Sequence, residues 1–326
     1  MIERDLVIVG GGPAGMAAAI SARESGVKDI LLLERDQCLG GILNQCIHTG
    51  FGIEYFKEVL TGPEYSNRFI EKIKEVPEIE VSLRTFVVKL TKEKILTYIK
   101  PGAMEDVRAK AVIMATGCRE KTREMVHIAG TRPSGIFSAG LAQKLINIEG
   151  LLPGKEAVVV GSGDIGLIMA RRFTLEGARV KAVIEIQGKS QGLIRNVAQC
   201  IEDFDIPMYF GHKISRIYGA DRVEKVSVAK VDENFNEILS SGFEIECDTV
   251  LISVGLIPEN ELIEMAGVEI DKKTNSPISK EVNKTSVPGI FCCGNSFKIY
   301  DLADWVSKES ELAGKMAADY IRLRIQ

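Results

Sequence analysis

The residues from Gly10 to Gly15 have the types and spacing that hold a dinucleotide. They read Gly-Gly-Gly-Pro-Ala-Gly, between an apolar stretch at 6–9 and a helical pattern at 13–25. In such a unit the first glycine permits a tight turn, the second lets the backbone approach a pyrophosphate, and the third lets helix and strand pack closely. The N-terminus of the helix offers partial positive charge to the phosphates. Glu34, at the end of the next apolar stretch, is placed to accept hydrogen bonds from ribose hydroxyls.

A second run, Gly161-Ser162-Gly163-Asp164-Ile165-Gly166, repeats the pattern, and Glu185 occupies the place of Glu34. A carboxylate there accepts a free 2′-hydroxyl and repels a 2′-phosphate, so we expect NADH to be preferred over NADPH. Lys189 and Arg195 lie downstream and could weaken that preference. The alternative is a domain that keeps this fold but binds nothing.

The elements that must position these turns form an alternating series of strands and helices, which predicts parallel sheets in an α/β protein. Each glycine unit has one strand–turn–helix–strand plan: strand 6–9, helix 13–25 and strand 30–34, then strand 157–160, helix 164–176 and strand 180–185. Elsewhere we expect a helix at 63–75, a β region at 80–99, a strand at 111–116, a meander at 214–245, strands at 249–253 and 290–293, and a closing helix at 304–322.

Composition excludes several classes of protein. The net charge is −4 and no long basic run occurs, so we expect no nucleic-acid partner. The opening residues do not form a signal peptide and no apolar run is long enough to span a bilayer, so we expect a cytoplasmic protein without direct membrane insertion. The seven cysteines include no CxxC pair, which makes a disulfide framework, a zinc site or another metal site improbable.

These features resemble the flavoprotein superfamily with two dinucleotide-binding domains. Ala115-Thr116-Gly117 looks like its second FAD signature, and Gly294-Asn295 looks like its C-terminal signature, where the usual second residue is Asp. The resemblance implies two Rossmann-like domains, with the NAD domain inserted in the FAD domain. We place the joints where polar, proline and glycine residues gather, so that 1–122 and 279–326 bind FAD and 123–278 bind NAD.

The resemblance also implies which residues line each site. For FAD these are Gly10, Gly12, Pro13, Ala14, Gly15, Glu34, Arg35, Gly41, Ile42, Val87, Ala115, Thr116, Gly117, Gly294, Asn295, Asp304, Trp305 and Val306. For NAD they are Gly161, Gly163, Asp164, Ile165, Gly166, Glu185 and Gly255.

A narrower resemblance comes from three segments: Gly40-Gly41-Ile42-Leu43-Asn44-Gln45-Cys46-Ile47-His48, residues 135–143 (Gly-Ile-Phe-Ser-Ala-Gly-Leu-Ala-Gln), and Asp301-Leu302-Ala303-Asp304. They look like FAD/NAD oxidoreductase subunits that accompany glycerol-3-phosphate dehydrogenases, which are similar to the α subunits of sarcosine oxidase, opine oxidase and hydrogen cyanide synthase. This implies a dehydrogenase partner subunit and allows a small redox subunit. It also implies that any peripheral membrane position is reached only through such partners.

The chain departs from the disulfide reductases of the superfamily. Where glutathione-reductase relatives carry two cysteines it has Leu43 and His48, and where thioredoxin reductases carry CxxC it reads Ser138-Ala139-Gly140-Leu141. Thiol–disulfide exchange of either type needs a pair of sulfurs on the enzyme, so we expect neither.

Two segments beside the expected flavin leave alternatives open. Cys46 is either a single redox cysteine whose pKa is lowered by His48, or a packed cysteine beside a histidine that bonds the flavin or backbone. Asp304 caps the closing helix, whose N-terminus by resemblance faces the flavin pyrimidine ring and would stabilise negative charge there. It could also be only a cap.

We therefore expect an FAD-dependent NADH oxidoreductase that exchanges electrons with a partner subunit, in a glycerol-3-phosphate dehydrogenase-type complex. The cofactors would carry the chemistry and the protein would position them. The rival is a free-standing NADH oxidase or peroxidase, or a coenzyme A-disulfide-type reductase that uses Cys46. A flavin-binding scaffold with a silent NAD site is the non-enzymatic alternative.

Overall fold

The computed structural model describes residues 1–279 and 281–324, and the chain divides into two compact units. The first unit joins Met1–Arg119 to Ile257–Gln326, and the second is Glu120–Leu256. Each unit carries one of the glycine turns. The second unit is thus inserted in the first, which is the arrangement expected for two Rossmann-like domains.

The first unit is built on a sheet in the order β5-β2-β1-β8-β7-β6, with β20 paired to β8. Its strands are β1 (Ile2–Val9), β2 (Ile30–Leu33), β5 (Ile79–Ser82), β6 (Phe86–Leu90), β7 (Ile95–Lys100), β8 (Ala103–Met114) and β20 (Ile290–Cys292). β1 is parallel to β2 and β8, and β20 is parallel to the last residues of β8. The carboxyl ends of these strands therefore meet at one edge, where the first glycine turn lies.

The side chains of β1 alternate between two cores. Leu6 and Ile8 pack with the helices on one face, whereas Val7 and Val9 pack with β6, β7 and α6 on the other. The helices of this unit are α1 (Pro13–Glu24), α2 (Gly62–Lys74), α6 (Glu261–Met265) and α7 (Ala303–Arg322). Both faces of the parallel strands are covered, which explains why β2 and the last four residues of β1 and of β8 are apolar and buried.

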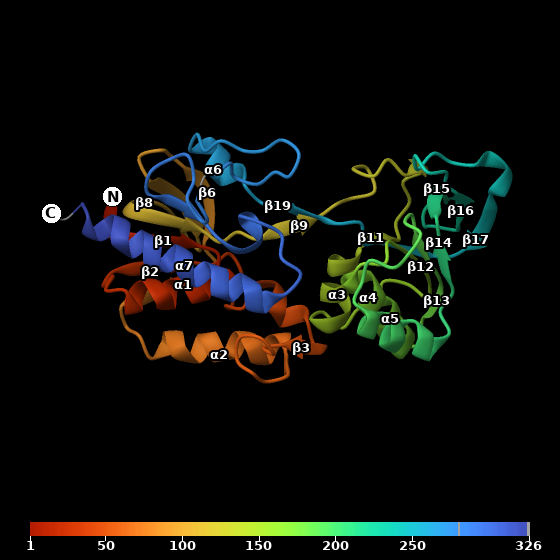
Figure 1. The fold of residues 1–326 in the computed structure, drawn as a ribbon, viewed down its shortest axis with the longest axis horizontal. Coiled ribbons are helices and arrows are strands. Elements are labelled where there is room, and N and C mark those ends of the chain that lie inside the picture. The colour runs from red at the N-terminus through yellow and green to blue at the C-terminus, as the bar shows by residue number, and fades with distance from the viewer. Residues whose placement is uncertain (280, 325–326) are drawn as a thin grey trace. The chain divides into compact units, whose positions relative to one another are not determined.

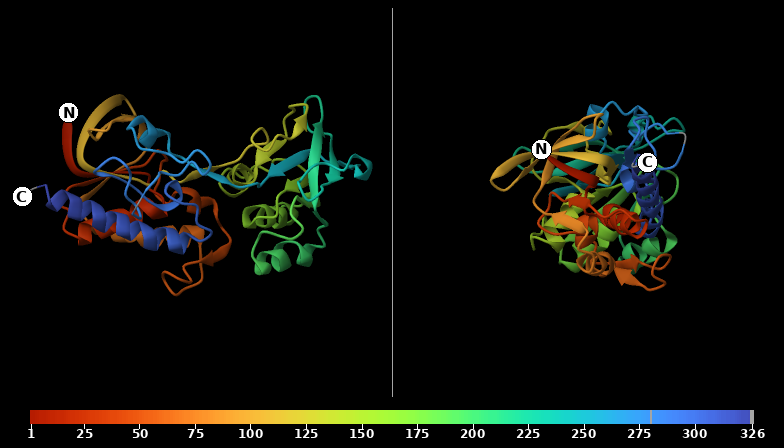
Figure 2. Two further views of the ribbon diagram at one scale, coloured as in Figure 1. Left: turned by 45° about the horizontal axis from the view of Figure 1, so that its top comes forward. Right: turned by 90° about the vertical axis from the view of Figure 1, so that its left-hand side faces the viewer.

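Helices α1 and α7 lie side by side over the same face of the sheet (Figures 1 and 2). Small residues permit the approach, because a Cβ added at Gly314 of α7 would lie 2.4 Å from the Ala18 carbonyl oxygen of α1. Ala313 and Ala317 are fully buried in the same core. The last helix of the chain is thereby held against the helix that follows the first glycine turn.

The second unit has three layers. Its parallel sheet runs β11-β18-β12-β13-β14, and a second sheet runs β10-β15-β16-β17. The strands are β10 (Ala129–Gly130), β11 (Ile136–Ser138), β12 (Glu156–Val160), β13 (Arg179–Glu185), β14 (Met208–Phe210), β15 (His212–Tyr218), β16 (Lys225–Lys230), β17 (Phe243–Glu246) and β18 (Thr249–Ile252). The helices α3 (Ala139–Asn147), α4 (Asp164–Leu175) and α5 (Ile194–Cys200) cover one face of the parallel sheet, and the meander β15–β17 covers the other (Figure 1).

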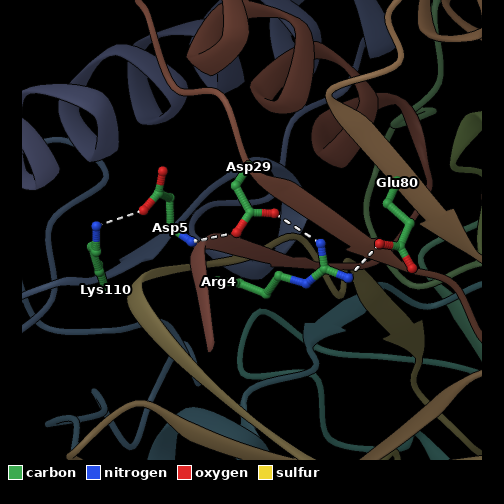
Figure 3. A network of polar contacts seen from close by, with 5 residues as sticks. All are labelled: Arg4, Asp5, Asp29, Glu80 and Lys110. Atoms are coloured by element: carbon green, nitrogen blue, oxygen red, sulfur yellow. Dashed lines mark hydrogen bonds and ion pairs between the residues drawn. The ribbon is translucent and has the colours of Figure 1, made fainter. Parts of the chain in front are cut away.

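A polar network ties together the amino ends of β1 and its neighbours (Figure 3). Arg4 pairs with Asp29 at 2.8 Å and with Glu80, which belongs to β5. Lys110 of β8 pairs with Asp5 at 2.7 Å. The network lies at the end of the sheet opposite the glycine turn, so its role is structural.

The second boundary between the units differs from the expected one. The sequence-based boundaries place residues 257–278 with the NAD domain, but these residues belong to the first unit. The reason is packing: Ile263, Ala266 and Val268 are buried in the core that contains β6 and β7. The short strands β9 (Cys118–Glu120) and β19 (Leu256–Pro258) pair where the chain passes between the units. The first boundary, at 119/120, lies close to the expected one at 122/123.

Candidate functional site

The glycines of the first turn have different surroundings. Gly10 has φ +108°, and a Cβ there would lie 2.3 Å from the Ala115 carbonyl oxygen. A Cβ at Gly15 would lie 1.8 Å from the Gly10 carbonyl oxygen. A Cβ at Gly12, by contrast, would meet only the Gly41 Cα, at 4.0 Å. The chain itself therefore requires glycine at 10 and 15, whereas the space before Gly12 is open and suits a pyrophosphate.

Helix α1, which follows this turn, has an N-terminus that suits an anion. α1 begins at Pro13 with Gly12 as its N-cap residue, and no side chain caps its first N–H groups. Proline has no backbone N–H, but at the first helical position an N–H would have no partner within the helix, so nothing is lost. Uncapped N–H groups and the helix dipole together form a site for a negatively charged group.

Glu34 supplies the expected carboxylate beside the first turn. It is 5% exposed; its Oε2 accepts from the Gly11 N–H at 2.6 Å, and its Oε1 from the Asp36 N–H at 2.7 Å. Each carboxylate oxygen has a second lone pair, so the group can still accept hydrogen bonds from ribose hydroxyls. The two backbone bonds hold the carboxylate in place.

The second turn repeats this construction. A Cβ at Gly161 would lie 2.1 Å from the Ser253 carbonyl oxygen, while no heavy atom lies within 4 Å of a Cβ at Gly163. Gly163 is the N-cap residue of α4 and no side chain caps that helix. Glu185 is 3% exposed and accepts from Ser162 N (2.8 Å), Ser162 Oγ (2.6 Å) and Gln187 N (2.7 Å).

The remaining residues of the expected NAD site lie around this turn. Asp164 begins α4, and its Oδ1 accepts from Leu193 N at 2.8 Å and Asn196 Nδ2 at 2.7 Å. It thus fastens the segment after β13, which includes the exposed Lys189 and Arg195, to the helix. Ile165 and Gly166 continue the first turn of α4, and Gly255, with φ +107°, follows the adjacent strand β18.

Several residues of the expected FAD site gather around Gly12. Gly41 opens the short 3-10 helix η1 (Gly41–Gln45). The preceding Gly40 donates its N–H to the Gly11 carbonyl at 2.9 Å, which fixes η1 against the turn. Ile42 of η1 is 61% exposed, so it remains available for contact.

The second signature lies beside the first strand. Ala115 packs on Gly10, and the Thr116 hydroxyl donates to the Glu259 carbonyl at 2.7 Å. Gly117 has φ +73° and open space around it. Arg35 forms an ion pair with Glu259 at 3.6 Å, and Val87 is buried in β6.

The C-terminal signature contacts the first turn directly. Gly294 begins the 3-10 helix η4 (Gly294–Ser296), and a Cβ there would lie 2.7 Å from the Cβ of Ala14 and 3.2 Å from Val306. The Asn295 amide accepts from Tyr300 N at 3.0 Å and donates to Cys118 Sγ at 3.6 Å. Ala14, Gly294 and Val306, far apart in sequence, are therefore neighbours.

Asp304 does not cap the closing helix as expected. The N-cap residue of α7 is Leu302, and Asp304 is the second helical residue. Its buried carboxylate accepts from Gly52 N at 3.0 Å and Glu54 N at 3.3 Å. Asp304 thus holds the loop after strand β3 (Thr49–Phe51), because that loop presents N–H groups that would otherwise lose their partners on burial. The next residue, Trp305, is 47% exposed.

The surroundings of Cys46 do not favour a reactive thiolate. Cys46 is buried and its thiol lies 3.3 Å from the Ile42 carbonyl. Burial raises the pKa of the thiol to about 12, so the expected lowering of the pKa by His48 is absent. His48 Nδ1 lies 3.1 Å from the Thr49 carbonyl and its ring packs near Phe51. None of the cysteines in the described residues forms a disulfide.

One buried carboxylate near the C-terminal signature is absent from the residues that the sequence patterns single out. Glu309 of α7 is 8% exposed, and its Oε2 accepts from the Gly294 N–H at 2.7 Å. Helical spacing is the signal that could find it, since Glu309 is three residues after the buried Val306 and four before the buried Ala313. A carboxylate on the buried face of a helix needs a hydrogen-bond donor, and here the Gly294 N–H of the C-terminal signature is that donor.

Comparison with known proteins is consistent with this geometry. A profile of the pyridine nucleotide-disulphide oxidoreductase family matches residues 4–309. The chain is 24% identical to hydrogen cyanide synthase subunit HcnB of Pseudomonas aeruginosa, with 89% of this chain and 65% of that protein covered. It is 22% identical to an opine oxidase subunit of Agrobacterium tumefaciens, with 96% and 64% covered. The chain therefore spans slightly less than two thirds of the length of these relatives.

The fold is that of a known class of solved structures. Thioredoxin reductase of T. acidophilum superposes with a TM-score of 0.75 at 22% identity, and all of both chains is covered. Among the described residues no helix is both long and apolar enough to cross a membrane. The family match, which extends through both glycine turns and into α7, establishes that the chain belongs to the pyridine nucleotide-disulphide oxidoreductase family of FAD-dependent enzymes.

Proposed function

We propose that the chain is an FAD-containing NADH oxidoreductase that exchanges electrons with a partner subunit. The first turn, with Glu34 and Gly294–Asn295, would hold FAD, and the second turn, with Glu185, would hold NADH. One observation carries the proposal: at both Gly12 and Gly163 an uncapped helix N-terminus opens onto free space beside a buried, backbone-held carboxylate.

The residues of each site would bind and orient rather than react. FAD held there would supply the chemistry of hydride and electron transfer between NADH and an acceptor. Glu34 and Glu185 would fix the ribose of each dinucleotide, and the two uncapped helices would neutralise the pyrophosphates. Cys46, a buried neutral thiol, would line the site without reacting.

Glu185 supports a preference for NADH. Three donors hold its carboxylate in the buried position where a 2′-phosphate would bring a second negative charge. Lys189 and Arg195 are exposed and form no ion pair within the described part of the chain, so they are the groups that would oppose this preference. Stopped-flow reduction should favour NADH at least tenfold, and Glu185→Ala should narrow the ratio.

A partner protein is supported by the relatives. HcnB is named as a subunit of hydrogen cyanide synthase, and the Agrobacterium relative is named as a subunit of opine oxidase. In this chain other residues occupy both positions where disulfide reductases carry their cysteine pairs, so it is not equipped to serve a diffusing disulfide. We propose a dehydrogenase partner of the glycerol-3-phosphate type, in the cytoplasm or at a membrane reached through that partner.

The test uses two matched variants. Gly12→Ala should fold normally but lose bound FAD, because the methyl group would occupy the open space that suits the pyrophosphate. Gly163→Ala should stay yellow but lose reduction by NADH for the same reason in the second unit. Flavin absorbance and stopped-flow reduction report the two losses separately. A Gly12→Ala protein with full FAD content would contradict the assignment of the first site.

A further inference from the structure

The Gly294–Asn295 turn is held from behind by a buried cluster that the proposed reaction does not use. Glu309 Oε2 accepts from Gly294 N at 2.7 Å, with the Ser310 hydroxyl 3.5 Å away. Glu309 Oε1 accepts from the Asn283 amide, which also donates to the Cys292 carbonyl at 3.0 Å. The cluster thus links α7, β20 and the segment before β20.

The contacts of Gly294 connect this cluster to the first glycine turn. A Cβ at Gly294 would lie 2.7 Å from Ala14 and 3.2 Å from Val306. Ala14 directly precedes Gly15, the third glycine of the turn. Gly294 leaves no room for a side chain between the turn that Glu309 holds and Ala14, so a shift of that turn would affect the N-terminus of α1.

Glu309 has no opposing charge. The titratable groups that face it are the thiols of Cys292, at the end of β20, and of Cys293, just after it, and the phenol of Tyr300 before α7, all neutral at pH 7. No cation pairs with Glu309 within the described ranges. Burial accordingly raises its pKa to about 7, although the bonds from Gly294 and Asn283 oppose the rise.

The cluster is also short of hydrogen-bond donors. Asn283 is fully buried, and its side-chain oxygen has no partner among the described residues. A proton on Glu309 adds one donor to the cluster. It also removes a negative charge from the site that the proposed function assigns to the anionic FAD.

We propose that Glu309 is a positioning residue of the first dinucleotide site, whose carboxyl group holds the Gly294–Asn295 turn and takes up a proton when the anionic dinucleotide binds. This inference rests on the proposed FAD site. The proton comes from solvent and no bond of the dinucleotide changes. Binding of FAD raises the cost of the charged carboxylate, so the affinity falls as the pH rises above neutrality.

The experiment is FAD titration of the apoprotein from pH 5.5 to 9, by flavin fluorescence and by calorimetry in two buffers of different ionisation enthalpy. The wild type should take up a fraction of a proton, approaching one, near pH 8, and its Kd should rise up to about tenfold per pH unit there. Glu309→Gln keeps an acceptor for Gly294 N but cannot titrate. Its Kd should vary less than threefold across this range, without the extra proton uptake.

Asp319→Asn, at an exposed carboxylate of the same helix, is the matched control and should behave as the wild type. An equal pH slope in Glu309→Gln and the wild type would overturn this inference alone. A wild-type apoprotein that binds no FAD at any pH would overturn the proposed function as well. If Glu309→Gln does not fold, wild-type calorimetry still decides, because proton uptake that is equal at pH 5.5 and pH 8 contradicts the titration of Glu309.

Discussion

At the scale of single residues, the glycines of each turn divide into two kinds. Gly10 and Gly15 are needed by the chain, because a side chain there would overlap backbone atoms. Gly12 and Gly163 are not needed by the chain, because the space around them is open. A bound pyrophosphate in that space, as proposed, would account for the second kind of glycine.

Gly15→Ala should therefore damage folding, in contrast to Gly12→Ala. Alanine favours a helix over glycine by about 1 kcal/mol, but the added methyl would lie 1.8 Å from the Gly10 carbonyl oxygen. The overlap should dominate and lower the free energy of unfolding by about 1–3 kcal/mol. Urea unfolding of the two apoproteins checks this. Equal stabilities would mean that α1 shifts freely.

Glu309 should make the stability of the apoprotein depend on pH. Its pKa in the folded chain is raised from 4.5 to about 7, so the folded state binds more protons between these values. The stabilisation from this group is therefore complete below pH 4.5 and is lost as the pH rises through 7. Between pH 5 and 8 the wild type should lose about 2 kcal/mol more than Glu309→Gln. Thermal unfolding of both proteins at both pH values measures the difference, and parallel curves would contradict the raised pKa.

Cys46 should behave as an inert thiol. Its pKa of about 12 leaves almost no thiolate at pH 8, whereas Cys38 is exposed. Iodoacetamide should modify Cys38 in the native protein and reach Cys46 only after unfolding, as peptide mass spectrometry can show. Cys46→Ser should leave flavin reduction by NADH within a few-fold of the wild type. Rapid native modification of Cys46 would revive the coenzyme A-disulfide alternative.

At the scale of elements, sequence is sufficient where a local pattern decides the structure. The strand–turn–helix units around Gly10 and Gly161 are predicted to within a few residues, because apolar periodicity and glycine spacing are local signals. Roles set by distant contacts are not predicted. The local pattern makes Asp304 a cap, but its partners lie in the loop at 52–54. The gathering of polar, proline and glycine residues that placed the second boundary is also a local signal, whereas residues 257–278 have their core partners in β6 and β7.

The two hydrogen bonds that the Asp304 carboxylate accepts should hold the loop at 52–54 against α7. Asp304→Ala removes two buried acceptors and leaves the Gly52 and Glu54 N–H groups without partners, at a cost of about 1–3 kcal/mol. Amide exchange at 50–58 should accelerate while exchange in α4 stays unchanged. Asp304→Asn keeps one acceptor oxygen, so its amide exchange at 50–58 should be intermediate between the wild type and Asp304→Ala. Unchanged exchange in Asp304→Ala would show that the aromatic contacts of Tyr55 and Phe56 hold the loop alone.

At the scale of the whole molecule, one design occurs twice. Each unit has its own buried core, its own set of parallel strands and its own glycine turn at the carboxyl ends of those strands. Each turn has an open glycine and a carboxylate held by backbone N–H groups. Under the proposed function, these two turns would bind the donor and the carrier of electrons, and the described residues hold no disulfide that would pass the electrons onward.

The route by which electrons leave the flavin is the last property to test. Thioredoxin and glutathione disulfide should not be reduced, because exchange with a disulfide needs two enzyme sulfurs and Cys46 is buried and neutral. Artificial one- or two-electron dyes need no such pair, so NADH-dependent dye reduction should proceed.

In extracts of the source cells the chain should co-purify with a dehydrogenase, and addition of that dehydrogenase's substrate should reduce the flavin without NADH. The control is Gly12→Ala, which should lose both reactions together because both pass through bound FAD. Steady NADH-dependent reduction of thioredoxin would overturn the expected absence of disulfide reduction. A free homo-oligomer that vigorously forms peroxide from NADH and oxygen would favour the oxidase over the partner subunit.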